Sequence, residues 1–111
     1  MVDNEVLACL PEAIAAAERP AQKALTQKLF RHRLNQALEL ADGYAFRFPA
    51  AALAEVERFV ANERKCCPFL AFEVRVAGAE KAVWLKMTGP EGTREVLEAE
   101  LDFMVAEEAG S

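Results

Sequence analysis

The chain has 111 residues and a formal net charge of −5. This length suits a single domain over residues 1–111, and no apolar run approaches the roughly 20 residues of a membrane-spanning helix. The negative charge disfavours nucleic-acid binding, and the acidic N-terminus lacks the regions of a signal peptide, so we expect a cytoplasmic protein with reduced cysteines and neither nucleic-acid nor membrane partners.

The N-terminal third is predicted to form a helical segment over residues 11–34. A short apolar run that contains Cys9 ends at Pro11, so we expect this cysteine to be buried or close to a site. Pro20 either kinks a short helix or lies in the first turn of a new helix that runs to about residue 33. The predicted buried stripe of that helix, with Phe30 to one side of it, contains Ala21, Leu25, Leu29 and His32.

The next segment predicts a β-hairpin. Residues 37–40 and 44–48 alternate apolar and other side chains on either side of Asp42-Gly43, a dipeptide that favours tight turns. Pro49 ends the second strand, because proline has no amide hydrogen to donate to a sheet.

A central helix is predicted from Ala50 to about Cys66 or Cys67. Pro68 disfavours the helical conformation at the residue before it, so the helix ends at the two cysteines. The apolar residues at helical spacing predict a buried face made of Leu53, Val56, Val60 and Cys67, flanked by Ala52, Phe59 and Cys66.

A second hairpin and a last helix complete the predicted order. Residues 70–76 and 83–87 alternate as half-buried strands, with a short connection between them. Thr88 is expected to cap a final helix that ends near residue 106, with Glu91 completing a capping box. Its predicted buried residues are Val96, Leu97, Leu101, Met104 and Val105.

These elements predict an α+β fold in the order α-ββ-α-ββ-α. The economical arrangement is one four-stranded antiparallel sheet, built from the two hairpins and covered by helices, with the ββαββα body spanning residues 35–106. A tryptophan on the opposite face suggests that the first helix or a second subunit covers part of it. That opposite face is expected to carry Glu39, Arg47, Glu73, Trp84, Arg75 and Lys86.

The adjacent thiols Cys66 and Cys67 are the main candidate functional groups. Glu63 precedes them by three and four residues, which places its carboxylate in the same helical neighbourhood. In one interpretation both cysteines are small buried hydrophobic residues, while Glu63 reaches solvent or pairs with a neighbouring basic residue. In the other, the pair binds a soft metal ion or undergoes oxidation and reduction. A disulfide between adjacent residues needs a strained backbone and is not expected.

Common enzyme and zinc motifs are absent from the sequence. It contains no phosphate-binding loop, dinucleotide fingerprint, Gly-x-Ser-x-Gly elbow or His-Glu-x-x-His motif. Structural zinc sites usually have separated Cys-x-x-Cys pairs, and adjacent cysteines fit two corners of one tetrahedron poorly. The sequence therefore favours a protein that is not an enzyme.

The segment Glu63-Arg64-Lys65-Cys66-Cys67-Pro68-Phe69, together with Asp42-Gly43 and Gly89-Pro90-Glu91-Gly92, resembles a family of small uncharacterised bacterial proteins. Its shared features are a Glu-Arg-x-Cys-Cys-Pro-Phe core, a Gly-Pro-x-Gly turn and an early cysteine that matches Cys9. The resemblance spans roughly residues 7 to 104. It implies an association of some members with heavy-metal resistance and no defined activity.

Three functional hypotheses follow. The first is binding of a soft metal or metalloid ion, such as arsenite or mercuric ion, by Cys66 and Cys67, with Cys9 and Glu63 as further ligands. The second is an interaction module that forms a homodimer or binds a partner through the Trp84 face, with structural cysteines. The third, a thiol enzyme that uses Glu63 for proton transfer, is disfavoured because the negative end of a helix opposes thiolate formation.

Overall fold

The computed structural model describes residues 10–31 and 37–99. Two short 3₁₀ segments precede α1, and a helix over residues 93–99 follows the last strand. No helix in the described ranges is long and apolar enough to cross a membrane. The main elements are α1 (Arg19–Phe30), β1 (Ala37–Leu40), β2 (Gly43–Pro49), α2 (Leu53–Cys66), β3 (Ala71–Ala77) and β4 (Ala82–Thr88).

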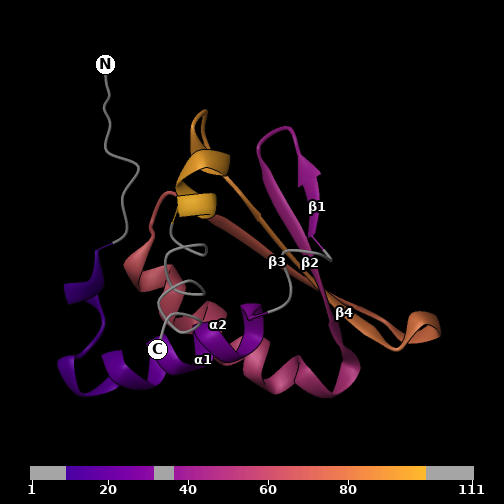
Figure 1. Ribbon diagram of the computed structural model, residues 1–111, viewed down its shortest axis with the longest axis horizontal. Helices are drawn as coiled ribbons and strands as arrows, with labels where there is room; N and C mark the ends of the chain where they lie inside the picture. The colour runs from indigo at the N-terminus through magenta and orange to yellow at the C-terminus, as the bar shows by residue number, and fades with distance from the viewer. Residues whose placement is uncertain (1–9, 32–36, 100–111) are drawn as a thin grey trace.

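The four strands form one antiparallel sheet in the order β1-β2-β4-β3 (Figure 1). The two predicted hairpins are confirmed, and they meet where β2 pairs with β4 along residues 43–49 and 82–88. Gly43 is required at this junction because a Cβ atom there would lie 1.9 Å from the backbone oxygen of Met87. The predicted α+β fold and its element order are therefore confirmed.

The helices cover one face of the sheet and enclose the core with it. Figure 1 shows α1 and α2 on the same side of the strands, where they also contact each other. Leu97, from the helix over residues 93–99, joins the same cluster. The largest side chains that are completely buried there include Phe30, Phe46, Phe48, Phe59, Leu85 and Met87.

The position of Phe30 differs from the sequence prediction, which placed it beside the buried stripe of the first helix. Its side chain is fully buried, and its ring contacts Phe46, Phe48 and Phe59 at centroid distances of 5.0, 5.5 and 5.2 Å. Ala21 is exposed instead. The helix therefore points Phe30 between the sheet and α2, because burial of this large aromatic ring dominates its orientation.

The orientation of β1 was also predicted wrongly. Leu38 pairs with Ala45 and lies on the open face of the sheet with 55% of its surface exposed, whereas Glu39 pairs with Tyr44 on the helix-covered face. Glu39 is exposed at the sheet edge and forms an ion pair with Arg94. The register set by the hairpin thus outweighs the apolar alternation of this short strand.

Two further expectations need correction. The first helix packs in the helix layer, so it does not cover Trp84 on the open face. Thr88 is the last residue of β4 and does not cap the final helix, which begins at residue 93 after a turn. Gly92 supplies the left-handed backbone of that turn with a φ of 97°.

His32 and the final helix beyond residue 99 lie outside the described residues.

Candidate functional site at the end of α2

The candidate site begins where Pro68 ends α2. The last residue of the helix is Cys66, as predicted, and Cys67 has φ and ψ of −121° and 77°. The Cys67 amide still donates to the Glu63 carbonyl oxygen at 2.7 Å, and the Cys67 carbonyl accepts from the amide of Leu70 at 3.1 Å. The chain therefore makes a tight connection from α2 into β3, with both cysteines at the joint.

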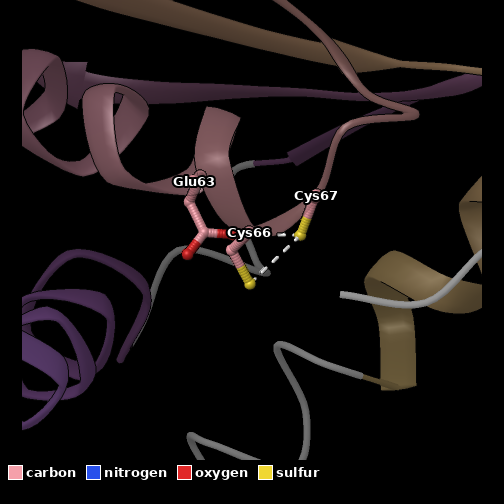
Figure 2. Close-up of side chains that lie close together, drawn as sticks. All are labelled: Glu63, Cys66 and Cys67. Carbon is pink, nitrogen blue, oxygen red and sulfur yellow. Dashed lines mark hydrogen bonds between the residues drawn. The ribbon is translucent and has the colours of Figure 1, made fainter. Parts of the chain in front are cut away.

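The two cysteine sulfurs lie side by side in the protein interior. Their Sγ atoms are 3.8 Å apart (Figure 2), and Cys66 and Cys67 are 6% and 1% exposed. This distance is far beyond the roughly 2.05 Å of a disulfide bond, so the predicted absence of a bond between the adjacent residues is confirmed. Cys67 is itself disulfide-bonded, and Cys66 is a free cysteine. This differs from the expectation that all three cysteines are reduced.

The carboxylate of Glu63 faces the sulfur pair from one turn earlier in α2. Its Oε1 atom lies 3.4 Å from Cys67 Sγ (Figure 2). The side chain is half-buried. One oxygen and the two sulfurs all lie within 4.8 Å of one another. The structure therefore brings together Glu63, Cys66 and Cys67, whereas Cys9 lies outside the described residues.

Gln22 of α1 holds the other side of this carboxylate. Its Nε2 donates to Glu63 Oε2 at 3.0 Å and to the Phe59 carbonyl oxygen at 3.2 Å. Its Oε1 accepts from Asn62 Nδ2, also at 3.2 Å. Because the Gln22 side chain is buried and uses both its donor and its acceptor groups, it fixes the carboxylate in one orientation.

Gln22 was not recognised from the sequence, although a signal was available. It lies three and seven residues before Leu25 and Leu29, and so belongs to the buried stripe of α1. A buried amide on an apolar stripe needs hydrogen-bond partners, which here come from α2. The partners themselves were not predictable, because no sequence pattern indicated how α1 and α2 would align.

The surroundings of the sulfurs are apolar. Ile14 is buried against both cysteines, and Phe69 and Leu70 pack on the same cluster. The amide of Leu10 donates to the Cys66 carbonyl oxygen at 2.6 Å, which fixes the start of the described chain to the end of α2. This small cluster adjoins the main core through Leu70, which packs against both, and it shields the sulfurs from water.

The donor set decides which chemistry the site suits. Two sulfur atoms and one carboxylate oxygen form a mainly soft set, which favours thiophilic ions over hard cations such as Mg²⁺ or Ca²⁺. The chain matches no protein-family model, and no curated protein or solved structure matches it significantly. The interpretation of the site therefore depends on its own geometry.

Proposed function

We propose that the reduced protein binds a soft metal or metalloid ion through Cys66 and Cys67, with Cys9 as a third thiolate. The observation that carries this proposal is the convergence of two buried sulfurs and one carboxylate oxygen within 4.8 Å. Thiolates bind thiophilic ions strongly, and a shielded apolar cluster limits competition from water. The resemblance to proteins that accompany heavy-metal resistance agrees with this choice of ligand class.

The separation of the sulfurs supports binding to a single ion. Two thiolates with metal–sulfur bonds of about 2.3 Å and a tetrahedral angle between them lie about 3.8 Å apart. The Sγ atoms of Cys66 and Cys67 are 3.8 Å apart. From the sequence, adjacent cysteines were expected to be a poor fit for a shared ion. Here both can bind the same ion, because α2 ends at Cys66 and Cys67 has a non-helical backbone.

Glu63 has two roles in this proposal. Metal binding to a thiol releases a proton, and Glu63 Oε1 lies 3.4 Å from Cys67 Sγ as the nearest described carboxylate oxygen. It therefore accepts the proton or, once the thiolate is formed, occupies a remaining coordination position of the ion. Gln22 supports both roles by holding the second carboxylate oxygen.

The oxidation state of Cys67 sets a condition for binding. A sulfur in a disulfide is not a thiolate and is a poor metal ligand, so the disulfide at Cys67 must be reduced first. Ion binding and disulfide formation thus compete for the same sulfur. We expect the oxidised protein to bind soft ions much more weakly than the reduced protein.

Calorimetric titration of the reduced protein with arsenite or mercuric ion tests the proposal. Wild type is expected to bind far more tightly than the Cys66→Ser and Cys67→Ser variants, because each variant loses one thiolate. Oxidised wild type is the matched control, since its sequence is identical. Equal affinity in wild type and both serine variants would rule out the proposed site.

A second candidate function is an interaction module in which the cysteines only pack. The observation that favours it is the very low exposure of both sulfurs within an apolar cluster. Alkylation of the reduced, native protein separates the two functions: resistance of both thiols, with full reaction after unfolding, favours the packing role. Rapid labelling of the native thiols, suppressed by a soft ion, favours metal binding.

A further inference from the structure

β3 forms one edge of the sheet, and none of the described residues is seen to pair with its outer side. It pairs with β4 along residues 71–77, and no hydrogen bond described for this structure joins its other edge to another segment. Three apolar side chains follow this edge on the helix-covered face, and Val76, at one end of the row, is 56% exposed. An unprotected strand of this length is a surface for pairing with another strand.

The sequence of β3 is symmetrical in chemical character about its central residue, Val74. At equal distances on the two sides of Val74, a carboxylate matches a guanidinium, then an aromatic residue matches an aliphatic one, and the two end residues are identical. The equivalent pairs around Val74 are Glu73 with Arg75, Phe72 with Val76, and Ala71 with Ala77. A strand with this symmetry is complementary to a second copy of itself in the antiparallel direction.

We propose that β3 pairs with β3 of a second copy of this chain, antiparallel and about a two-fold axis at Val74. Two four-stranded sheets then join edge to edge into one continuous sheet of eight strands. Each Glu73 faces the partner's Arg75, and each Phe72 faces the partner's Val76. The interface follows the outer edge of β3, beside the open face that carries Trp84, and does not include the cysteine site.

Charge selects this register over its neighbours. The nearest alternative registers that keep the apolar side chains of both strands on the same face move the two-fold axis from Val74 to residue 73 or residue 75. They place Glu73 opposite the partner's Glu73, or Arg75 opposite the partner's Arg75. Like charges at directly opposed positions destabilise a strand pair, so only the register centred on Val74 satisfies both residues. Both are exposed, so they are available for this pairing.

The charges within one subunit fit the same arrangement. Lys86 Nζ lies 3.5 Å from Glu73 Oε1 on the open face. In the paired sheet, Glu73 has this lysine on one side and the partner's Arg75 on the other. Two symmetry-related rows of alternating charge, each running from Lys86 through Glu73 to the partner's Arg75, then cross the junction without two like charges as direct neighbours. This supports a second copy as the occupant rather than an unrelated strand.

The helix-covered face gains apolar contacts from the same pairing. Phe72 and Val74 already pack on the core cluster, while Val76 is largely exposed. Pairing covers Val76 with the partner's Phe72 and places the two copies of Val74 together at the axis. Strand edges alone give a small interface, below about 1,200 Å², so the expected dimer is reversible and dissociates on dilution.

Charge-reversal variants provide the test, measured by sedimentation velocity over a concentration series. Glu73→Arg gives the edge two cations and Arg75→Glu gives it two carboxylates, so each variant alone is expected to weaken self-association roughly tenfold or more. An equimolar mixture of the two variants restores every opposite-charge pair across the interface, although not the Glu73–Lys86 pair within one subunit, and is expected to dimerise far more strongly than either variant alone. Trp84→Ala is the control and is expected to leave the dimer unchanged.

Each alternative result contradicts the proposal. Wild type that stays monomeric at millimolar concentration, or charge variants that associate like wild type, would show that β3 is not the interface. A mixture no more associated than the single variants would show that their effect is not electrostatic pairing. Dissociation caused only by Trp84→Ala would assign the dimer to the open face. The circular dichroism of each variant establishes that it is folded.

Discussion

At the scale of single residues, Gln22 has a structural role that the sequence pattern did not indicate. It connects α1 with α2, and it is the described side chain that orients the carboxylate beside the sulfur pair. Glutamine on a helix surface is usually unimportant for stability, but here both ends of the amide are used in a buried position. The site is therefore shared between two helices, although its described candidate ligands, Glu63, Cys66 and Cys67, all come from the end of α2.

Gln22→Leu is expected to destabilise the protein by about 1–3 kcal/mol, because it removes a buried amide together with its hydrogen bonds to the Glu63 carboxylate and the Phe59 carbonyl oxygen. It should also weaken soft-ion binding by the reduced protein. Asn62→Ala is the matched control, since it removes a bond to Gln22 and leaves the carboxylate held. Urea unfolding and calorimetry measure the two effects, and unchanged ion affinity in Gln22→Leu would separate this residue from the site.

Tyr44 offers a direct spectroscopic readout, because it is the only tyrosine in the chain. Its hydroxyl donates to Glu98, and that hydrogen bond, with a smaller contribution from burial, raises the pKa of Tyr44 from 10.0 to about 12. Absorbance titration should show ionisation near pH 12 in wild type and nearer to 10 in Glu98→Ala. Glu95→Ala, in the same helix, should titrate like wild type, and a Glu98→Ala midpoint equal to that of wild type would contradict this assignment.

The same shift predicts how stability changes in alkali. The folded state holds the tyrosine proton more tightly than the unfolded state, whose pKa is near 10. The stabilising contribution of Tyr44 is therefore complete below pH 10 and is lost as the pH rises towards 12. In Glu98→Ala this loss should be smaller over the same interval, as measured by urea unfolding at a series of pH values.

At the scale of elements, the close contact between β2 and β4 limits what the junction tolerates. Gly43→Ala places a Cβ atom 1.9 Å from a backbone oxygen that cannot move without breaking the sheet, so we expect a loss of about 1–3 kcal/mol or more. Gly78→Ala is the control, because no atom lies within 4 Å of its added Cβ. Thermal unfolding compares the two, and equal stability would mean that the strands can separate at residue 43.

The elements themselves were predictable because each has a strong local signal. Proline set the ends of β2 and α2, and alternation set β3 and β4. Asp42-Gly43 indicated the first hairpin, but its turn lies one residue earlier than predicted, at Ala41 and Asp42, and Gly43 begins β2. The orientation of β1 was not predictable from its own four residues, since its register comes from pairing with β2. Phe30 and Gln22 were misplaced or missed for a related reason: their roles depend on contacts with α2 and the sheet, which no local pattern contains.

At the scale of the whole molecule, the disulfide at Cys67 links oxidation state to stability. Reduction should lower the free energy of unfolding by about 2–4 kcal/mol, the usual contribution of a structural disulfide. Cys66→Ser should keep this sensitivity to a reductant, whereas Cys67→Ser should lose it. Urea unfolding with and without reductant measures the difference, and two variants with the same response would contradict a stabilising bond at Cys67.

The strand order also determines the expected sequence of folding events. Each hairpin joins segments that are close in the chain and can form early, whereas the pairing of β2 with β4 must bring together residues 43–49 and 82–88 across the whole of α2. Closing that intervening loop is the slow step that we expect in folding. Because α2 and its two terminal cysteines lie inside the loop, the thiols stay accessible to oxidants and metals in the nascent chain until the centre of the sheet has closed.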